Sequence, residues 1–146
     1  MSAVAVREYS VVREPSAPAR VGYVVAVLVN AGLLYVAENL LAWNVPYVTE
    51  DWVAVLWAVR LSLVAGLAAN AMYVAYDAAW FRHLTGIGTG ALALLSMVIT
   101  YAVFPFDLPS AFIAEVVQLA MLAGMLGMSI AVLAQFVHLL TGCRER

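Results

Sequence analysis

Four long apolar runs, separated by short polar segments, dominate the hydrophobic pattern of the chain. They cover about 21–43, 51–76, 86–104 and 111–140. A helix needs about 20 mostly apolar residues to cross the hydrocarbon core of a bilayer, and each run is close to or above that length. The pattern predicts an all-α fold: an integral membrane bundle of four transmembrane helices.

Local signals indicate where these helices begin. Thr49 is a suitable N-cap for the second helix, and two acidic residues follow it at the positive end of the helix dipole. We expect Thr85 to cap the third helix and Asp107 or Ser110 to cap the fourth. Residues 77–83 are predicted to continue the second helix into the cytoplasmic interface.

A polar leader over 1–20 precedes the transmembrane domain, which covers 21–146. Pro15 and Pro18 are expected to end any regular element in this cytoplasmic N-terminal leader. A cleavable signal peptide has a short apolar core, whereas the run over 21–43 is long enough to span. We therefore expect the first helix to be retained.

The placement of arginine predicts the orientation of the bundle. The two loops at 44–50 and 105–110 contain no arginine, and six of the seven cations lie on the opposite side. Cytoplasmic loops of membrane proteins carry the excess of positive charge, so both termini are predicted to be cytoplasmic (N-in/C-in). The six residues are Arg7, Arg13, Arg20, Arg82, Arg144 and Arg146.

The composition supports a membrane location. Hydrophobic residues make up 66% of the chain and charged residues 11%, whereas about a quarter of a soluble domain is charged. We expect a multi-pass protein of the bacterial cytoplasmic (inner) membrane, with the lipid bilayer as its main partner. A net charge of −2 and the lack of a basic run argue against a nucleic-acid partner.

Small residues recur at four-residue spacing on two predicted helices, where they allow close approach of helix backbones. Such ridges serve either packing within one chain, which we favour, or a homo-oligomer face. The ridges are Ala58, Ser62 and Gly66, continued by Asn70, on the second helix, and Ala123, Gly127 and Ala131 on the fourth.

Three ionisable residues, Glu38, Arg60 and Glu115, fall inside the predicted spans, where charge is costly and commonly functional. At 1.5 Å per residue, Glu38 lies ~7.5 Å below the outer end of its run and Arg60 ~13 Å below its own. A snorkelling arginine could therefore meet both acids in the outer half of the membrane. The predicted polar pocket comprises Glu38, Asn39, Arg60, Thr100, Tyr101, Glu115 and Gln118.

Two interpretations of this pocket stay open. Two acids that share one guanidinium would leave one carboxyl poorly neutralised, which suits proton or cation exchange. Alternatively, the charges form an ion-pair network that only fixes helix register.

A second polar set is predicted in the cytoplasmic half of the membrane. Hydrogen bonds between helices explain it better than an inner vestibule that continues the outer pocket. Its members are Asn30, Asn70, Tyr73, Asp77, Gln135 and His138.

No pattern of catalytic, cofactor or metal-binding residues stands out. The chain has no CxxC, HExxH, GxGxxG or Walker A spacing. Of its two histidines, His83 is expected in a loop, and the residue three before His138 is Gln135, so the Glu-x-x-His spacing of bundle metal sites is absent. The sequence therefore predicts no cofactor and no metal, and it disfavours an enzyme.

Three segments carry a resemblance to known proteins: WNVPYVTED after the first run, AANAMYVAYDAAWFR at the end of the second, and VFPFD after the third. With these, the chain resembles an uncharacterised family of small four-span membrane proteins common in high-GC bacteria. The resemblance implies a four-helix fold and an inner-membrane location, and it implies no activity.

Two functions remain from the sequence. The first is permeation of ions, protons or small solutes through the outer pocket, in a homo-oligomer because one such bundle is small for alternating access. The second is a non-catalytic subunit or assembly partner among other subunits of a larger membrane complex.

Overall fold

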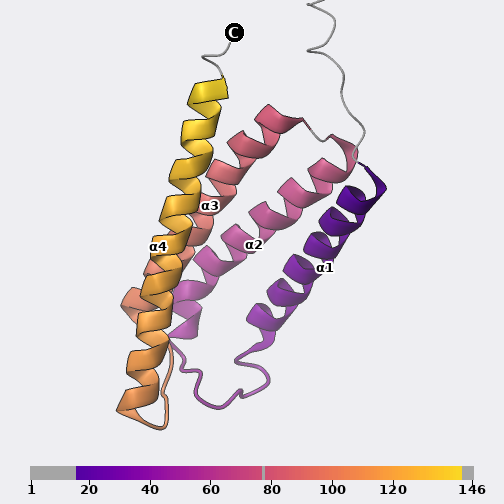
Figure 1. Ribbon diagram of the computed structural model, residues 1–146. Helices are drawn as coiled ribbons and strands as arrows, with labels where there is room; N and C mark the ends of the chain where they lie inside the picture. The colour runs from indigo at the N-terminus through magenta and orange to yellow at the C-terminus, as the bar shows by residue number, and fades with distance from the viewer. Residues whose placement is uncertain (1–15, 77, 143–146) are drawn as a thin grey trace, which may run out of the picture.

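The computed structural model describes residues 16–76 and 78–142, which form four α-helices (Figure 1). Each helix is long and apolar enough to cross a membrane, which confirms the predicted all-α membrane fold. Arg7, Arg13, Asp77, Cys143, Arg144 and Arg146 lie outside the described residues. The helices are α1 (Ala17–Asn39), α2 (Trp52–Ala75), α3 (Ala79–Val103) and α4 (Ala111–Gly142).

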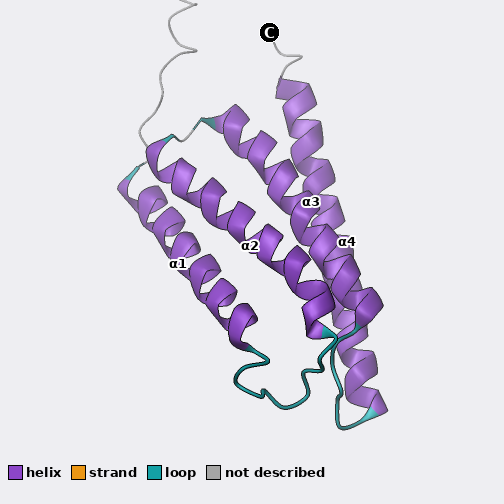
Figure 2. Ribbon diagram, turned by 180° about the vertical axis from the view of Figure 1, so that it is seen from behind, coloured by secondary structure: helices purple, strands orange, loops and turns teal. Residues whose placement is uncertain are grey.

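The helices follow one another across the bundle in chain order. In the described residues α1 packs on α2, α2 on α3 and α3 on α4, and no other pair of helices is in contact. Figures 1 and 2 show α1 and α4 at opposite edges of this arrangement. We call the end that carries the α1–α2 and α3–α4 connections the loop end, and the other the tail end, which the arginines predict to be cytoplasmic.

The first helix begins earlier than expected. It starts at Ala17, inside the predicted leader, and Pro18 lies in its first turn. The backbone N–H groups of a first helical turn have no partner within the helix, so a proline there forfeits no hydrogen bond.

The connection at the tail end also differs from expectation. The second helix ends at Ala75, Tyr76 is extended, and α3 already begins at Ala79. Thr85 therefore lies inside α3, where its hydroxyl bonds to the carbonyl of Phe81 instead of capping a helix. The apolar pattern missed this start because the first turns of α3 are rich in aromatic and polar residues.

At the loop end, one of two expected caps forms. The Ser110 hydroxyl accepts a hydrogen bond from the N–H of Ile113 at 3.2 Å, as an N-cap does. Thr49 instead keeps a buried hydroxyl without a partner among the described residues, and α2 begins three residues later at Trp52. The predicted cap at Thr49 was therefore wrong.

The two loops are tied together beside a small buried core. The backbone N–H of Thr49 donates to the carbonyl of Pro105 at 3.0 Å, and the backbone N–H of Asp107 donates to the carbonyl of Tyr47 at 2.9 Å. Trp52 lies beneath this contact, and its indole N–H donates to the carbonyl of Ala37 at 2.9 Å. This bond between Trp52 and Ala37 holds the end of α1 against the start of α2.

Two glycines of α3 differ in their surroundings. A Cβ at Gly90 would lie 2.7 Å from Cγ2 of Val132 on α4, whereas nothing lies within 4 Å of a Cβ at Gly88. The Val132 side chain is branched at Cβ and stiff, so it has little freedom to move aside.

We expect Gly90→Ala to lower the free energy of unfolding by about 1–3 kcal/mol relative to Gly88→Ala, because it overpacks the α3–α4 contact. Both substitutions gain the same helix propensity, so their comparison isolates the contact. Titration of SDS into mixed micelles, followed by circular dichroism, measures the free energy of unfolding of each variant. Equal stabilities for the two variants would show that the contact is not tight.

Candidate functional site

A bidentate ion pair joins the first two helices inside their spans. Nε of Arg60 on α2 donates to Oε1 of Glu38 on α1 at 2.5 Å, and Nη2 donates to Oε2 at 2.7 Å. This fork geometry matches a guanidinium to a carboxylate and fixes their relative orientation. It locks α1 and α2 in register near the loop end.

The pair is open to its surroundings. The side chains of Arg60 and Glu38 are 54% and 34% exposed, and the apolar side chains of Trp57 and Val64, on the same face of α2, are exposed as well. In a membrane-spanning helix such a surface meets lipid or other helices. A charged pair on it is unusual, because ionisable groups in spans almost always face protein or water.

The remaining members of the predicted outer pocket are dispersed. Glu115 is exposed on α4, and α3 separates that helix from α2, so the ion pair of Arg60 includes only Glu38 among the described residues. Asn39 and Thr100 bond to carbonyls of their own helices, those of Tyr35 and Ser96. Tyr101 on α3 and Gln118 on α4 are half-buried.

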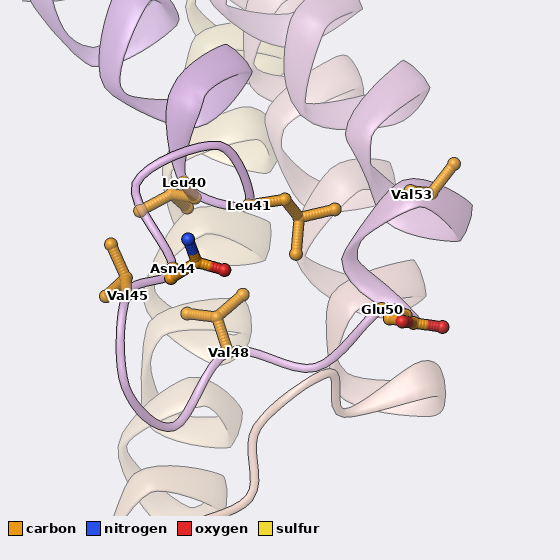
Figure 3. Close-up of a pocket in the computed structure, with 7 residues that line it drawn as sticks. All are labelled: Leu40, Leu41, Asn44, Val45, Val48, Glu50 and Val53. Atoms are coloured by element: carbon orange, nitrogen blue, oxygen red, sulfur yellow. The ribbon is translucent and has the colours of Figure 1, made fainter.

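A separate cavity of about 560 Å³ lies at the loop end. Figure 3 shows apolar side chains and the amide of Asn44 around it, with the carboxylate of Glu50 at its edge. Neither Glu38 nor Arg60 lines it. The lining residues are Leu40, Leu41, Asn44, Val45, Val48, Glu50 and Val53.

Two residues of the inner polar set form hydrogen bonds within their own helices. The amides of Asn30 and Asn70 donate to the carbonyls four residues earlier in their own helices, those of Ala26 and Gly66. The hydroxyl of Tyr73 on α2 pairs with that of Thr85 on α3, which links these two helices.

The two histidines come together across α3 and α4. The rings of His83 and His138 are 5.9 Å apart between centroids and inclined by 24°. One turn away, the side-chain oxygen of Gln135 lies against Gly86, where a Cβ would be 1.9 Å from it. That oxygen is buried without a hydrogen-bond partner in the described chain. His83 was expected in a loop, and that expectation was wrong because α3 begins at Ala79.

The small-residue ridges of α2 and α4 differ in what they face. On α2, Ala58 is buried, and a Cβ at Gly66 would be 3.0 Å from the side chain of Asn30 on α1. On α4, Ala123, Gly127 and Ala131 are all exposed, and nothing lies within 4 Å of a Cβ at Gly127. The α4 ridge therefore faces away from the bundle.

Fold and composition define a multi-pass membrane protein with four helices in contact with lipid. No protein-family model, curated protein or solved structure matches the chain.

Proposed function

We propose that this chain is a non-catalytic subunit of a larger membrane assembly, and that it binds its neighbours through the surface around Glu38 and Arg60. The observation that carries the proposal is the exposure of this ion pair on spanning helices. Neighbouring helices that cover the pair would remove it from lipid and use the guanidinium N–H groups that Glu38 leaves unbonded.

The fourth helix offers independent support. Its ridge of small residues is exposed, and no described residue lies within 4 Å of a Cβ at Gly127, although such ridges allow close packing of membrane helices. Glu115 lies two four-residue steps before Ala123, so it belongs to the same ridge. Both edges of the molecule thus carry features that suit contact with further helices.

Permeation is the second candidate. It draws on the same intramembrane charges and on the open cavity at the loop end. However, each helix packs only on its neighbours in sequence, so one described chain does not surround a path. Several copies would have to enclose it, and the subunit function needs no such further step.

Site-specific photo-crosslinking in native membranes tests the proposal. A photoreactive residue at Val64, on the face of Arg60, should crosslink to protein in fixed stoichiometry, whereas one at Val98 on α3 should not. The two sites are matched, with exposures of 45% and 46%. The crosslink should disappear in the double variant Glu38→Met/Arg60→Met, which removes the charges and retains apolar bulk.

Two outcomes would count against a subunit role. One is equal crosslinking at Val64 and Val98, with the chain isolated alone by native mass spectrometry. The other is flux of protons or monovalent cations through proteoliposomes that contain only this chain, lost in Glu38→Gln and Glu115→Gln, which would favour permeation.

A further inference from the structure

We propose that His83 and His138 form a binding site for a divalent transition-metal ion at the tail end of α3 and α4. The proposal is independent of the subunit function, because it concerns the tail end of α3 and α4, whereas that function rests first on the Glu38–Arg60 pair near the loop end of α1 and α2. It rests on the approach of the only two histidines of the chain.

The spacing of the rings fits a shared ion. A Zn–N bond of 2.0–2.1 Å places the metal roughly 3.2 Å from the centre of each imidazole. Two such rings are then roughly 5.2 Å apart at a tetrahedral angle and roughly 6.4 Å apart when they lie opposite each other. The observed separation of 5.9 Å falls between these limits.

The two rings are inclined by 24°, and each would have to rotate to direct a nitrogen at a shared ion. The terminal torsion of histidine is broad, so each ring can turn one nitrogen toward a common point at little cost. The two helices are in contact here, because the end of the Gln135 side chain lies against Gly86, one turn from both histidines.

The ligand class follows from the donors. Neutral imidazole suits zinc, copper and nickel, whereas magnesium and calcium prefer oxygen ligands. No group of three metal-binding side chains occurs among the described residues, so water would fill the remaining positions. Such an ion would link the ends of α3 and α4, and it would stabilise the folded chain more as the free metal concentration rises above the dissociation constant.

A zinc titration of the full chain in detergent, purified without a polyhistidine tag, tests the site. We expect one Zn²⁺ per chain. Loss of an outer-shell group alone commonly costs 10–100-fold in affinity, so His83→Ala or His138→Ala should each weaken binding by ~10-fold or more. Thr141→Ala is the matched control, since its hydroxyl bonds to carbonyls of α4 among the described residues, and it should bind as the wild type does.

A second measurement needs no variant. The electron paramagnetic resonance spectrum of bound Cu²⁺ should show coupling to two imidazole nitrogens, which only His83 and His138 can supply. A spectrum with one or no imidazole nitrogen would overturn the proposal and leave the rings as an aromatic contact. Zinc affinity that survives both alanine substitutions, or that is lost only in Cys143→Ser, would also overturn it.

Discussion

Arg60→Met is expected to lower the yield of folded protein in the membrane several-fold, whereas Glu38→Met/Arg60→Met should recover most of the loss. The single change leaves the carboxylate of Glu38 without its bidentate partner on an exposed surface of membrane-spanning helices. The double change removes both charges together and replaces them with apolar chains. Detergent extraction followed by size-exclusion chromatography measures the yield.

Leu61→Met is the control for this series, because it introduces the same side chain at the next, exposed position of α2. It should leave the yield unchanged. Equal losses in the single and double variants would mean that folding in the membrane needs the ion pair itself and not only the neutralisation of Glu38. No loss in the single variant would mean that the charges reach water and do not depend on each other.

The helices were predictable because hydrophobic runs near 20 residues have few alternatives in a membrane. Their ends were less so. Ser110 caps α4, but the hydroxyl of Thr49 does not bond to α2, and the hydroxyl of Thr85 bonds to a carbonyl of its own helix. A residue with a capping side chain has several possible partners, and the choice depends on loop contacts such as that of Thr49 with Pro105, which join segments far apart in sequence.

The contacts between polar side chains were also only partly predictable from the sequence. Depth arithmetic placed Glu38 and Arg60 at compatible levels, and they pair. It placed Glu115 at a similar depth, but depth carries no information on which helices are neighbours. The separation of α2 from α4 is a property of the packing order. The meeting of His83 and His138 was missed for a related reason, since it needs α3 to begin before Thr85.

Trp52 is a residue whose position in the sequence and whose contacts in the structure suggest different roles. Because it is an aromatic residue at the loop end, its sequence position suggests a place at the membrane–water interface. In the structure it is only 8% exposed, packs with Ala37 and Val55, and donates its indole N–H to α1. It therefore anchors the contact between the two helices that carry the ion pair.

We expect Trp52→Ala to lower the free energy of unfolding by about 3–5 kcal/mol, as loss of a large buried aromatic side chain does. Trp57→Ala, five residues along the same helix, should change it by about 0.5 kcal/mol or less, because Trp57 is 53% exposed and faces outward. SDS titration of both variants measures the difference.

Trp52→Phe separates packing from hydrogen bonding. It retains most of the ring but removes the donor to Ala37, which should cost about 1 kcal/mol for the bond in addition to the loss of ring volume. If Trp52→Ala and Trp57→Ala prove equally mild, the α1–α2 contact does not depend on this core. In that case Glu38 and Arg60 must supply the register of the two helices by themselves, and Arg60→Met should then separate α1 from α2.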